Sequence, residues 1–309
     1  MACLKRRLSL LSIPASLCLL AMALSPLAAA QDTAAAAPAT NEMSRFAPKD
    51  VSFVAKGKGV FGADVKLVGT LYTPVKSASP APLVIMSHGS DADVAARRKM
   101  TSRGYANPAR YFLNRGFAVL YFLRPSYGES EGPYLEVNRT CLNADYGPGF
   151  EAMADTVLSA YDFAQTLPGI DTQRIIFAGH SAGGTASIAA AARNVKGVVA
   201  YINFAGGKGG SESTPYAPCS PQVVSRLFAD YAARTTLPAL WVYAPNDLYF
   251  GGEVAPGWHK ATVAAGGKAR LFMTAAAKTD RDGHHVVQRE MTLWIPAVDG
   301  FLKELGFAW

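Results

Sequence analysis

The sequence predicts an α/β fold in which a mostly parallel sheet carries helices on both faces. Several short runs are continuously apolar, and they alternate with segments whose apolar residues recur at helical spacing. Continuous apolar runs are typical of strands buried on both faces, and helices connect such strands in parallel order. Polar, glycine-containing loops follow the runs. Because ligands bind beyond the carboxyl ends of parallel strands, we expect the functional residues along one edge of the sheet.

The first 30 residues have the parts of a secretory signal peptide. Three basic residues at 5–7 precede a mainly apolar run at 8–27, and Ala28 to Ala30 form an A-x-A cleavage site. Residues 31–48 are dominated by Ala, Thr, Pro and polar side chains, which predicts a flexible leader. Residues 49–309 are expected to form one large α/β domain. We therefore expect an exported protein, periplasmic or secreted, with no membrane anchor after signal cleavage.

The elements of this domain are expected in the following order. Alternating residues at 51–55 and 65–73, separated by glycines, predict an antiparallel pair at one edge of the sheet. Buried strands are expected at 82–90, 116–123, 195–204, 239–244 and 270–274. Helices are expected at 107–114, 150–166, 221–235, 259–265 and 291–305. In the last of these, Pro296 should kink the helix or delay its start.

A further strand and helix flank the motif around which the prediction of function is built. An apolar run from Arg174 leads into G-x-S-x-G at Gly179–Gly183, and an Ala-rich helix then runs to Arg193. Such a sharp turn forces its serine into a strained backbone conformation, in which only small neighbours avoid collision. The positive end of the following helix favours a developing negative charge. We interpret Ser181 as a nucleophile rather than as part of a plain glycine-rich turn.

A serine hydroxyl needs a base, and the base needs a third group that holds one tautomer. His284 and His285 follow a polar loop after the last predicted strand, and we choose His284, with His285 as the rival. Asp247 ends the predicted strand at 239–244 and is our choice for the acid. Asp280 and Asp282 are alternatives, but both lie so close to His284 in sequence that we expect them in a surface loop.

Five segments resemble the α/β-hydrolase superfamily, in particular its dienelactone hydrolase-like branch. They are 84–89 (VIMSHG), 124–130 (RPSYGES), 179–184 (GHSAGG), 241–247 (WVYAPND) and 282–284 (DGH), and the resemblance covers about 51–305. It implies a mostly parallel eight-stranded sheet and a serine-hydrolase triad in the order Ser181, Asp247, His284. Dienelactone hydrolases themselves use a cysteine nucleophile, so their lactone substrate is not expected here.

An oxyanion hole needs two hydrogen-bond donors directed at one point. We expect one donor to be the backbone N–H of Ala182, the residue that follows the nucleophile. The second should come from the loop after His88 and Gly89, where we choose Ser90; an ordinary loop serine is the alternative.

Two cysteines remain after signal cleavage. Cys141 and Cys219 lie in polar segments that each follow a predicted strand, and exported compartments oxidise such pairs. We expect a disulfide between them, with two buried free thiols as the alternative. No His/Cys cluster has the spacing of a metal site, so we expect neither a metal nor a cofactor. Residues 206–210 (GGKGG) lack the spacing of a phosphate-binding loop, and we interpret them as the rim of a pocket.

Charge gives no indication of a polyanionic partner. Removal of the signal leaves 30 − 3 = 27 basic residues against 23 acidic ones, a net charge of +4 that is spread along the chain. We therefore expect no nucleic acid as partner. The sequence does not predict the oligomeric state.

The leading hypothesis is an exported serine hydrolase that cleaves small carboxylic esters through a covalent acyl-enzyme. A serine peptidase of the prolyl-oligopeptidase type is the first alternative, although the chain has no room for an N-terminal propeller. The second alternative is a catalytically silent binding protein on a hydrolase scaffold, which is less expected because all three triad residues are present.

Overall fold

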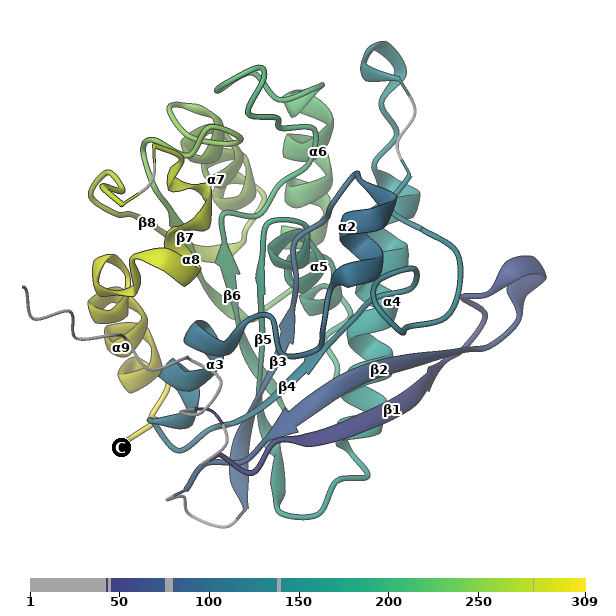
Figure 1. Ribbon diagram of the computed structural model, residues 1–309. Helices are drawn as coiled ribbons and strands as arrows, with labels where there is room; N and C mark the ends of the chain where they lie inside the picture. Colours follow the sequence, from purple (N-terminus) through teal and green to yellow (C-terminus); the bar gives the residue numbers. More distant parts are fainter. Residues whose placement is uncertain (1–42, 44–45, 76–79, 138–139, 280) are drawn as a thin grey trace, which may run out of the picture. The chain divides into compact units, whose positions relative to one another are not determined.

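The computed structural model describes residues 43, 46–75, 80–137, 140–279 and 281–309 (Figure 1). The predicted signal peptide at 1–30 and most of the predicted leader at 31–48 lie outside these residues. At the end of that leader, Met43 and Phe46 are buried, and Phe46 O accepts a hydrogen bond from Thr73 N at 3.1 Å. The described residues all belong to one compact unit, 38–309.

An eight-stranded sheet with the order β1-β2-β4-β3-β5-β6-β7-β8 forms the centre of this unit. β1 pairs with β2, and β2 with β4, in antiparallel fashion, whereas all the remaining pairs are parallel. This is the mostly parallel sheet that the sequence predicts. The strands are β1 (Lys49–Ala55), β2 (Val65–Tyr72), β3 (Ala81–Ser87), β4 (Ala118–Phe122), β5 (Ile170–His180), β6 (Val198–Phe204), β7 (Pro238–Tyr243) and β8 (Lys268–Met273).

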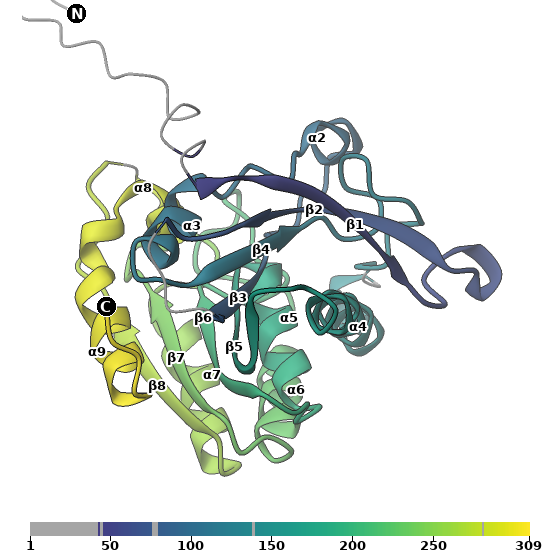
Figure 2. The ribbon, with the colours of Figure 1, turned by 90° about the horizontal axis from the view of Figure 1, so that it is seen from below.

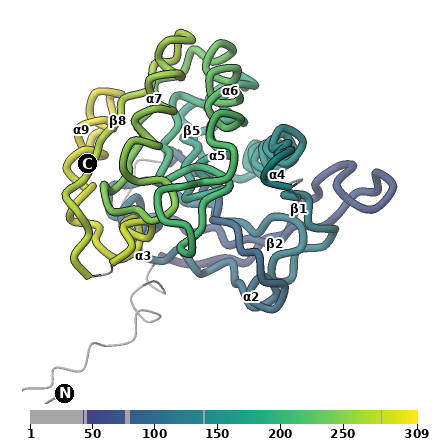
Figure 3. The backbone as a smooth tube through the Cα atoms, turned by 90° about the horizontal axis from the view of Figure 1, so that it is seen from above, coloured from purple at the N-terminus to yellow at the C-terminus, as the bar shows by residue number. Residues whose placement is uncertain are grey.

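Helices cover both faces of the sheet (Figure 2). One face packs against α4 (Gly147–Ala164), α5 (Ala182–Ala191), α6 (Pro221–Ala232) and α7 (Val254–Ala264). Of these, α4, α5 and α6 lie side by side, with α5 in the middle (Figure 3). The other face packs against α3 (Ala106–Leu113), α8 (Val286–Arg289) and α9 (Ile295–Glu304).

Burial on both faces explains why the central strands read as continuously apolar. All five residues of β4 are buried. In β3, Leu83 and Ile85 belong to the core under α4 and α5, whereas Val84 and Met86 belong to the core under α3 and α9. Successive side chains of a strand point to opposite faces, so each face needs its own apolar set. The helix α5 is likewise buried at all ten positions.

Several elements differ from the expected boundaries. A short helix, α2 (Val94–Lys99), follows β3 where only a loop was expected. Helix α7 begins at Val254, five residues before the predicted start at His259. The last helix begins at Ile295, so Pro296 lies in its first turn, where its missing N–H costs no hydrogen bond. Short 3-10 turns occupy Val60–Gly62, Cys141–Asn143, Gly283–His285 and Met291–Leu293. Across the described ranges, no helix has the length and apolar character needed to span a bilayer.

Candidate active site

Ser181 lies in a strained turn between β5 and α5, the elbow at 179–183. Its backbone angles are φ 54° and ψ −124°, outside the ordinary regions for a residue with a side chain. The turn leaves no space near its glycines: a Cβ on Gly183 would lie 2.2 Å from Ser87 O, and one on Gly179 would lie 2.2 Å from Gly183 O. Ser181 N donates to Phe204 O of β6 at 2.9 Å. The structure therefore holds Ser181 at the carboxyl edge of the sheet, at the N-terminus of a buried helix.

Asp247 and His284 form a buried pair at the same edge. His284 Nδ1 lies 3.0 Å from Asp247 Oδ2, and both side chains are buried. Asp247 Oδ1 accepts hydrogen bonds from the backbone N–H groups of Tyr249 and Phe250 at 2.8 and 3.0 Å, which fixes the carboxylate. A carboxylate facing Nδ1 places the imidazole proton there, so Nε2 is left with the lone pair that can accept a proton.

The His284 loop is shaped by Asp282, which the sequence analysis placed at the surface. That expectation is wrong for Asp282: its side chain is only 6% exposed. Its Oδ1 accepts hydrogen bonds from His284 N and Leu248 N, both at 2.9 Å, because the 3-10 turn at 283–285 needs a capping acceptor. The ring of Tyr249 stacks on the His284 imidazole, with the centroids 4.2 Å apart. Asp280 lies outside the described residues.

The other histidines near this edge have different surroundings. His285 also borders the cavity. Burial is the main cause that lowers the pKa of His285, and the neighbouring His284 lowers it further. His180 Nδ1 lies 2.8 Å from Tyr105 Oη, and its Nε2 lies 2.7 Å from His284 O, so this ring supports the His284 loop. Burial, together with the nearby His284 and His285, holds the pKa of His180 well below its usual range. His180 is thus a neutral hydrogen-bonding group inside the turn.

Ser181 and His284 border a common cavity of about 250 Å³. Its walls come from the loop after β3, the start of α3, the elbow and the two loops after β7 and β8. The lining residues are Gly89, Ser90, Asp91, Met100, Tyr105, His180, Ser181, Tyr249, His284, His285 and Gln288. The cavity is the volume in which a group bound to Ser181 would lie.

The loop after β3 brings Gly89 and Ser90 against the elbow. A Cβ on Gly89 would lie 3.2 Å from the Cβ of Ser181, so the loop backbone passes directly over the serine. Gly89 N donates to Tyr105 Oη at 3.2 Å. Within the described part of the chain, the backbone N–H groups of Ser90 and Ala182 donate no hydrogen bond. They are therefore the amides available to a ligand at this point.

A buried ion pair beneath this loop escaped the sequence analysis. Arg124 Nε donates to Glu136 Oε1 at 2.7 Å, and both side chains are almost fully buried. Arg124 also donates to Ser87 Oγ at 2.9 Å and to Gly89 O at 3.3 Å, so it holds the loop backbone from below. Burial alone would raise the pKa of Glu136, but the charges of Arg124 and Lys208 outweigh it and lower that pKa to about 2. In the sequence, Arg124 begins a polar loop at 124–132, but nothing in that pattern indicates that it pairs with Glu136.

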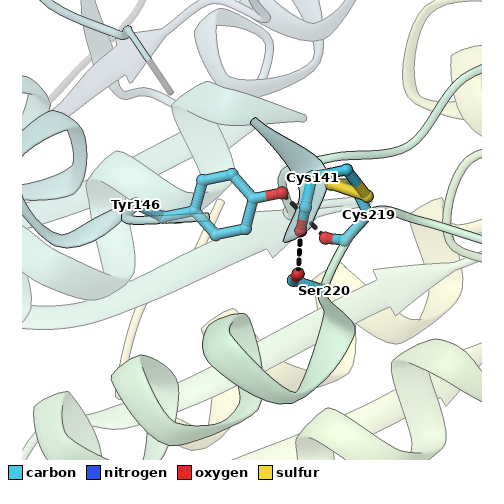
Figure 4. The surroundings of a disulfide bond; sticks show 4 residues. All are labelled: Cys141, Tyr146, Cys219 and Ser220. Atoms are coloured by element: carbon cyan, nitrogen blue, oxygen red, sulfur yellow. Dashed lines mark hydrogen bonds between the residues drawn. A yellow bond between two sulfur atoms is a disulfide. The ribbon is translucent and has the colours of Figure 1, made fainter. Parts of the chain in front are cut away.

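The predicted disulfide between Cys141 and Cys219 is present, with the Cα atoms 5.3 Å apart (Figure 4). It links the excursion after β4 to the excursion after β6. Tyr146 Oη donates to Cys219 O at 2.7 Å, and Ser220 Oγ donates to Cys141 O at 2.6 Å. Cys141 is exposed and Cys219 is partly exposed, which excludes the alternative of two buried thiols.

One group of side chains in the described residues could reach a common metal ion. Donor atoms of Glu212, Asp282 and His285 all lie within 4.8 Å of one another. Asp282 already caps the His284 turn, and Glu212 Oε1 accepts a hydrogen bond from Tyr249 Oη at 3.1 Å. These bonds account for the positions of both carboxylates.

The arrangement of sheet and helices recurs in solved structures of known enzymes. The esterase Pf2001 of Pyrococcus furiosus superposes with a TM-score of 0.61 at 19% identity, covering 85% of this chain and 93% of that one. The chain has the α/β-hydrolase fold. Est1E from Butyrivibrio proteoclasticus superposes with a TM-score of 0.53 at 18% identity, covering 83% of this chain and 98% of that one.

A peptidase is also among the structures with this fold. The acylaminoacyl peptidase of Pyrococcus horikoshii superposes with a TM-score of 0.55 at 16% identity. It is matched over 83% of this chain but over only 40% of its own length. No protein-family model matches the sequence, and no curated protein matches it significantly. At these identities the similarity establishes the fold, and the chemistry must be argued from the site.

Proposed function

We propose that this protein is an exported serine hydrolase that cleaves small carboxylic esters, with Ser181 as nucleophile, His284 as base and Asp247 as the group that orients the base. The observation that carries the proposal is that Ser181, in a strained elbow, and His284, held by the buried Asp247, border one cavity. Along the chain the three residues come in the order Ser, Asp, His that is typical of α/β-hydrolases. The motifs resemble the dienelactone hydrolase-like branch of that superfamily, with a serine in place of the cysteine nucleophile. The esterases with the same fold support the choice of substrate class.

In the proposed reaction these groups act in the following sequence. Ser181 Oγ attacks the ester carbonyl carbon while His284 Nε2 takes the hydroxyl proton, and the imidazolium is stabilised by Asp247. The carbonyl oxygen becomes an oxyanion, which the N–H groups of Ala182 and Ser90 would bind. Collapse of this intermediate breaks the bond to the alcohol, which leaves with the proton from His284. Water, activated by the same imidazole, then releases the acid from Ser181.

Labelling with a fluorophosphonate tests the nucleophile directly. We expect one equivalent of probe on Ser181, located by peptide mass spectrometry, and no labelling of Ser181→Ala. A panel of p-nitrophenyl esters should then be hydrolysed by the wild-type protein and not by Ser181→Ala. Absence of both labelling and turnover in folded protein would favour the silent binding scaffold instead.

A peptidase is the second candidate, because structures with this fold include the acylaminoacyl peptidase. Aminoacyl p-nitroanilides assayed beside the ester panel distinguish the two. We expect kcat/KM for the esters to exceed that for the anilides by orders of magnitude. The opposite order would replace the esterase proposal by the peptidase.

A further inference from the structure

Lys208 lies beside Ser90, in the loop after β3 that borders the cavity. Lys208 follows β6, and its Nζ lies 3.5 Å from Ser90 Oγ, while Ser90 borders the cavity that contains Ser181. In the described residues Lys208 forms no ion pair. Burial lowers the pKa of Lys208, and the nearby Arg124 lowers it further, whereas Glu136 raises it. The Lys208 side chain is partly exposed, and an ammonium group shielded from part of its water is costly unless a negative charge compensates it.

Glu136, the carboxylate that raises the pKa of Lys208, already accepts hydrogen bonds from other groups. Glu136 Oε1 accepts from Arg124, while Oε2 accepts from Ser90 Oγ and from Tyr127 Oη. Two cations, the buried Arg124 and the partly exposed Lys208, thus lie near one carboxylate in this cluster. The cluster retains one positive charge, and it lies on the Ser90 side of the cavity.

Two acidic groups have other partners: Asp91, which lines the cavity, and Glu212, which lies near the lining residue His285. Asp91 Oδ1 accepts from Asp93 N at 2.8 Å, at the start of α2. Glu212 Oε1 accepts from Tyr249 Oη at 3.1 Å. Neither carboxylate forms a hydrogen bond or an ion pair with Lys208 in the described residues.

The loop that carries Lys208 is held in place. Gly209 has φ +84°, and a Cβ there would lie 2.5 Å from Tyr146 Oη, so only glycine fits. Gly209 O accepts a hydrogen bond from Cys219 N at 2.8 Å. Cys219 is in turn tied to Cys141 by the disulfide (Figure 4). Lys208 is therefore placed by a fixed backbone, as expected for a group that recognises a ligand.

We propose that Lys208 makes the site selective for esters that carry an anionic group, such as a carboxylate, in addition to the ester bond. The proposal rests on the esterase function proposed above and names its substrate class. An anion that reaches the Ser90 side of the cavity would supply the negative charge that the Arg124, Glu136 and Lys208 cluster lacks. A charge-assisted hydrogen bond from Lys208 would favour such a substrate by about tenfold or more over a neutral one.

Two matched substrate pairs test the proposal. The first pair carries the charge on the acyl side: mono-p-nitrophenyl glutarate against p-nitrophenyl pentanoate. The second carries it on the alcohol side: 4-carboxyphenyl butyrate against 4-carbamoylphenyl butyrate. The measured quantity is the ratio of kcat/KM for the anionic and the neutral ester. Comparing this ratio between proteins cancels the intrinsic reactivities of the two esters.

We expect Lys208→Met and Lys208→Gln to lower this ratio by about tenfold or more for at least one pair, and Lys208→Arg to retain it. Lys260→Met, an exposed lysine on α7, is the control and should leave the ratio unchanged. A ratio that is unchanged for both pairs in both neutral variants overturns the role of Lys208. If the folded wild-type protein hydrolyses none of the four esters, the esterase function itself fails.

Discussion

Two adjacent histidines at the cavity differ in their partners, and this difference is the reason for proposing His284 as the base. His284 Nδ1 lies 3.0 Å from the buried Asp247 Oδ2, whereas in the described residues His285 lies near Asp282 and Glu212 but forms no hydrogen bond with either carboxylate. We expect His284→Ala to lower kcat for ester hydrolysis by about four orders of magnitude or more. The residues of a catalytic triad act as a unit, so the loss of one removes most of their combined effect. His285→Ala should retain most of the activity. The reverse result in a steady-state assay would transfer the role of base to His285.

The buried Glu136 should make stability depend on acid pH. Its pKa is lowered from 4.5 to about 2 in the folded protein, so the folded state favours the ionised carboxylate. The resulting stabilisation is fully present above pH 4.5 and is lost as the pH falls from 4.5 toward 2. Its size is about 3 kcal/mol in the free energy of unfolding. Urea unfolding between pH 7 and pH 3 measures it.

The matched variants for this measurement are Glu136→Gln and Glu131→Gln. Glu136→Gln removes the buried carboxylate and should have a lower free energy of unfolding at pH 7, together with a weaker dependence on acid. Glu131, more than half exposed, forms a long ion pair of 3.9 Å with Lys66 Nζ and accepts a hydrogen bond from Lys66 N at 3.0 Å, which a glutamine oxygen can also accept. Surface pairs of this kind contribute little, so Glu131→Gln should follow the wild type. Identical acid dependence in all three proteins would exclude the assigned role of Glu136.

At the scale of elements, the contact between α5 and the loop after β3 depends on Gly183. A Cβ there would lie 2.2 Å from Ser87 O and 2.6 Å from His88 O, and both atoms belong to backbone. We expect Gly183→Ala to lower the free energy of unfolding by about 1 to 3 kcal/mol and to displace Ser90 from Ser181. Ester turnover should therefore fall together with stability.

A glycine in an open position provides the control for Gly183. Gly257 lies in α7, and no atom lies within 4 Å of the Cβ that alanine would add. Alanine is the better helix former, so Gly257→Ala should leave stability unchanged or raise it by up to about 1 kcal/mol. Thermal unfolding of both variants tests the pair. Equal effects would mean that the backbone contact of Gly183 is not tight.

The strands were predictable because their burial on both faces is visible as uninterrupted apolar sequence. In β3, Val84 and Met86 serve one core while Leu83 and Ile85 serve the other. The helix α2 was missed because its six residues, VAARRK, carry no apolar stripe of sufficient length. The start of α7 was misplaced because Pro256 and Gly257 are usually turn residues, although the first turn of a helix tolerates proline.

Charged contacts beneath the site could not be predicted in the same way. Arg124 and Glu136 are only 12 residues apart, but their pairing depends on how the loop after β4 folds back under Ser90. Asp282 was expected at the surface because its neighbours are polar, and its capping bonds to His284 N and Leu248 N arise only in the folded loop. Hydrophobic patterns report burial, whereas polar partners are set by tertiary structure.

At the scale of the whole molecule, the sheet brings residues that are far apart in sequence to one edge. Ser90, Ser181, Lys208, Asp247 and His284 follow β3, β5, β6, β7 and β8 respectively. Because these five strands are parallel, the residues that follow them meet at the same edge. The position of the candidate site is thus a consequence of topology, and the loops determine only which groups it contains.

The disulfide joins the excursion after β4 to the excursion after β6 that also carries Lys208, and it should affect both stability and selectivity. Cys141 and Cys219 are separated by 78 residues, and closing a loop of that length stabilises the folded state by about 4 kcal/mol. The double variant Cys141→Ser, Cys219→Ser should therefore melt roughly 10 °C lower. Since Cys219 N also holds Gly209 O, loss of the bridge should loosen Lys208 and lower the ratio of kcat/KM for anionic over neutral esters. Calorimetry and the four-ester assay measure the two effects. A lower melting temperature with an unchanged ratio would show that the bridge stabilises the protein without positioning Lys208.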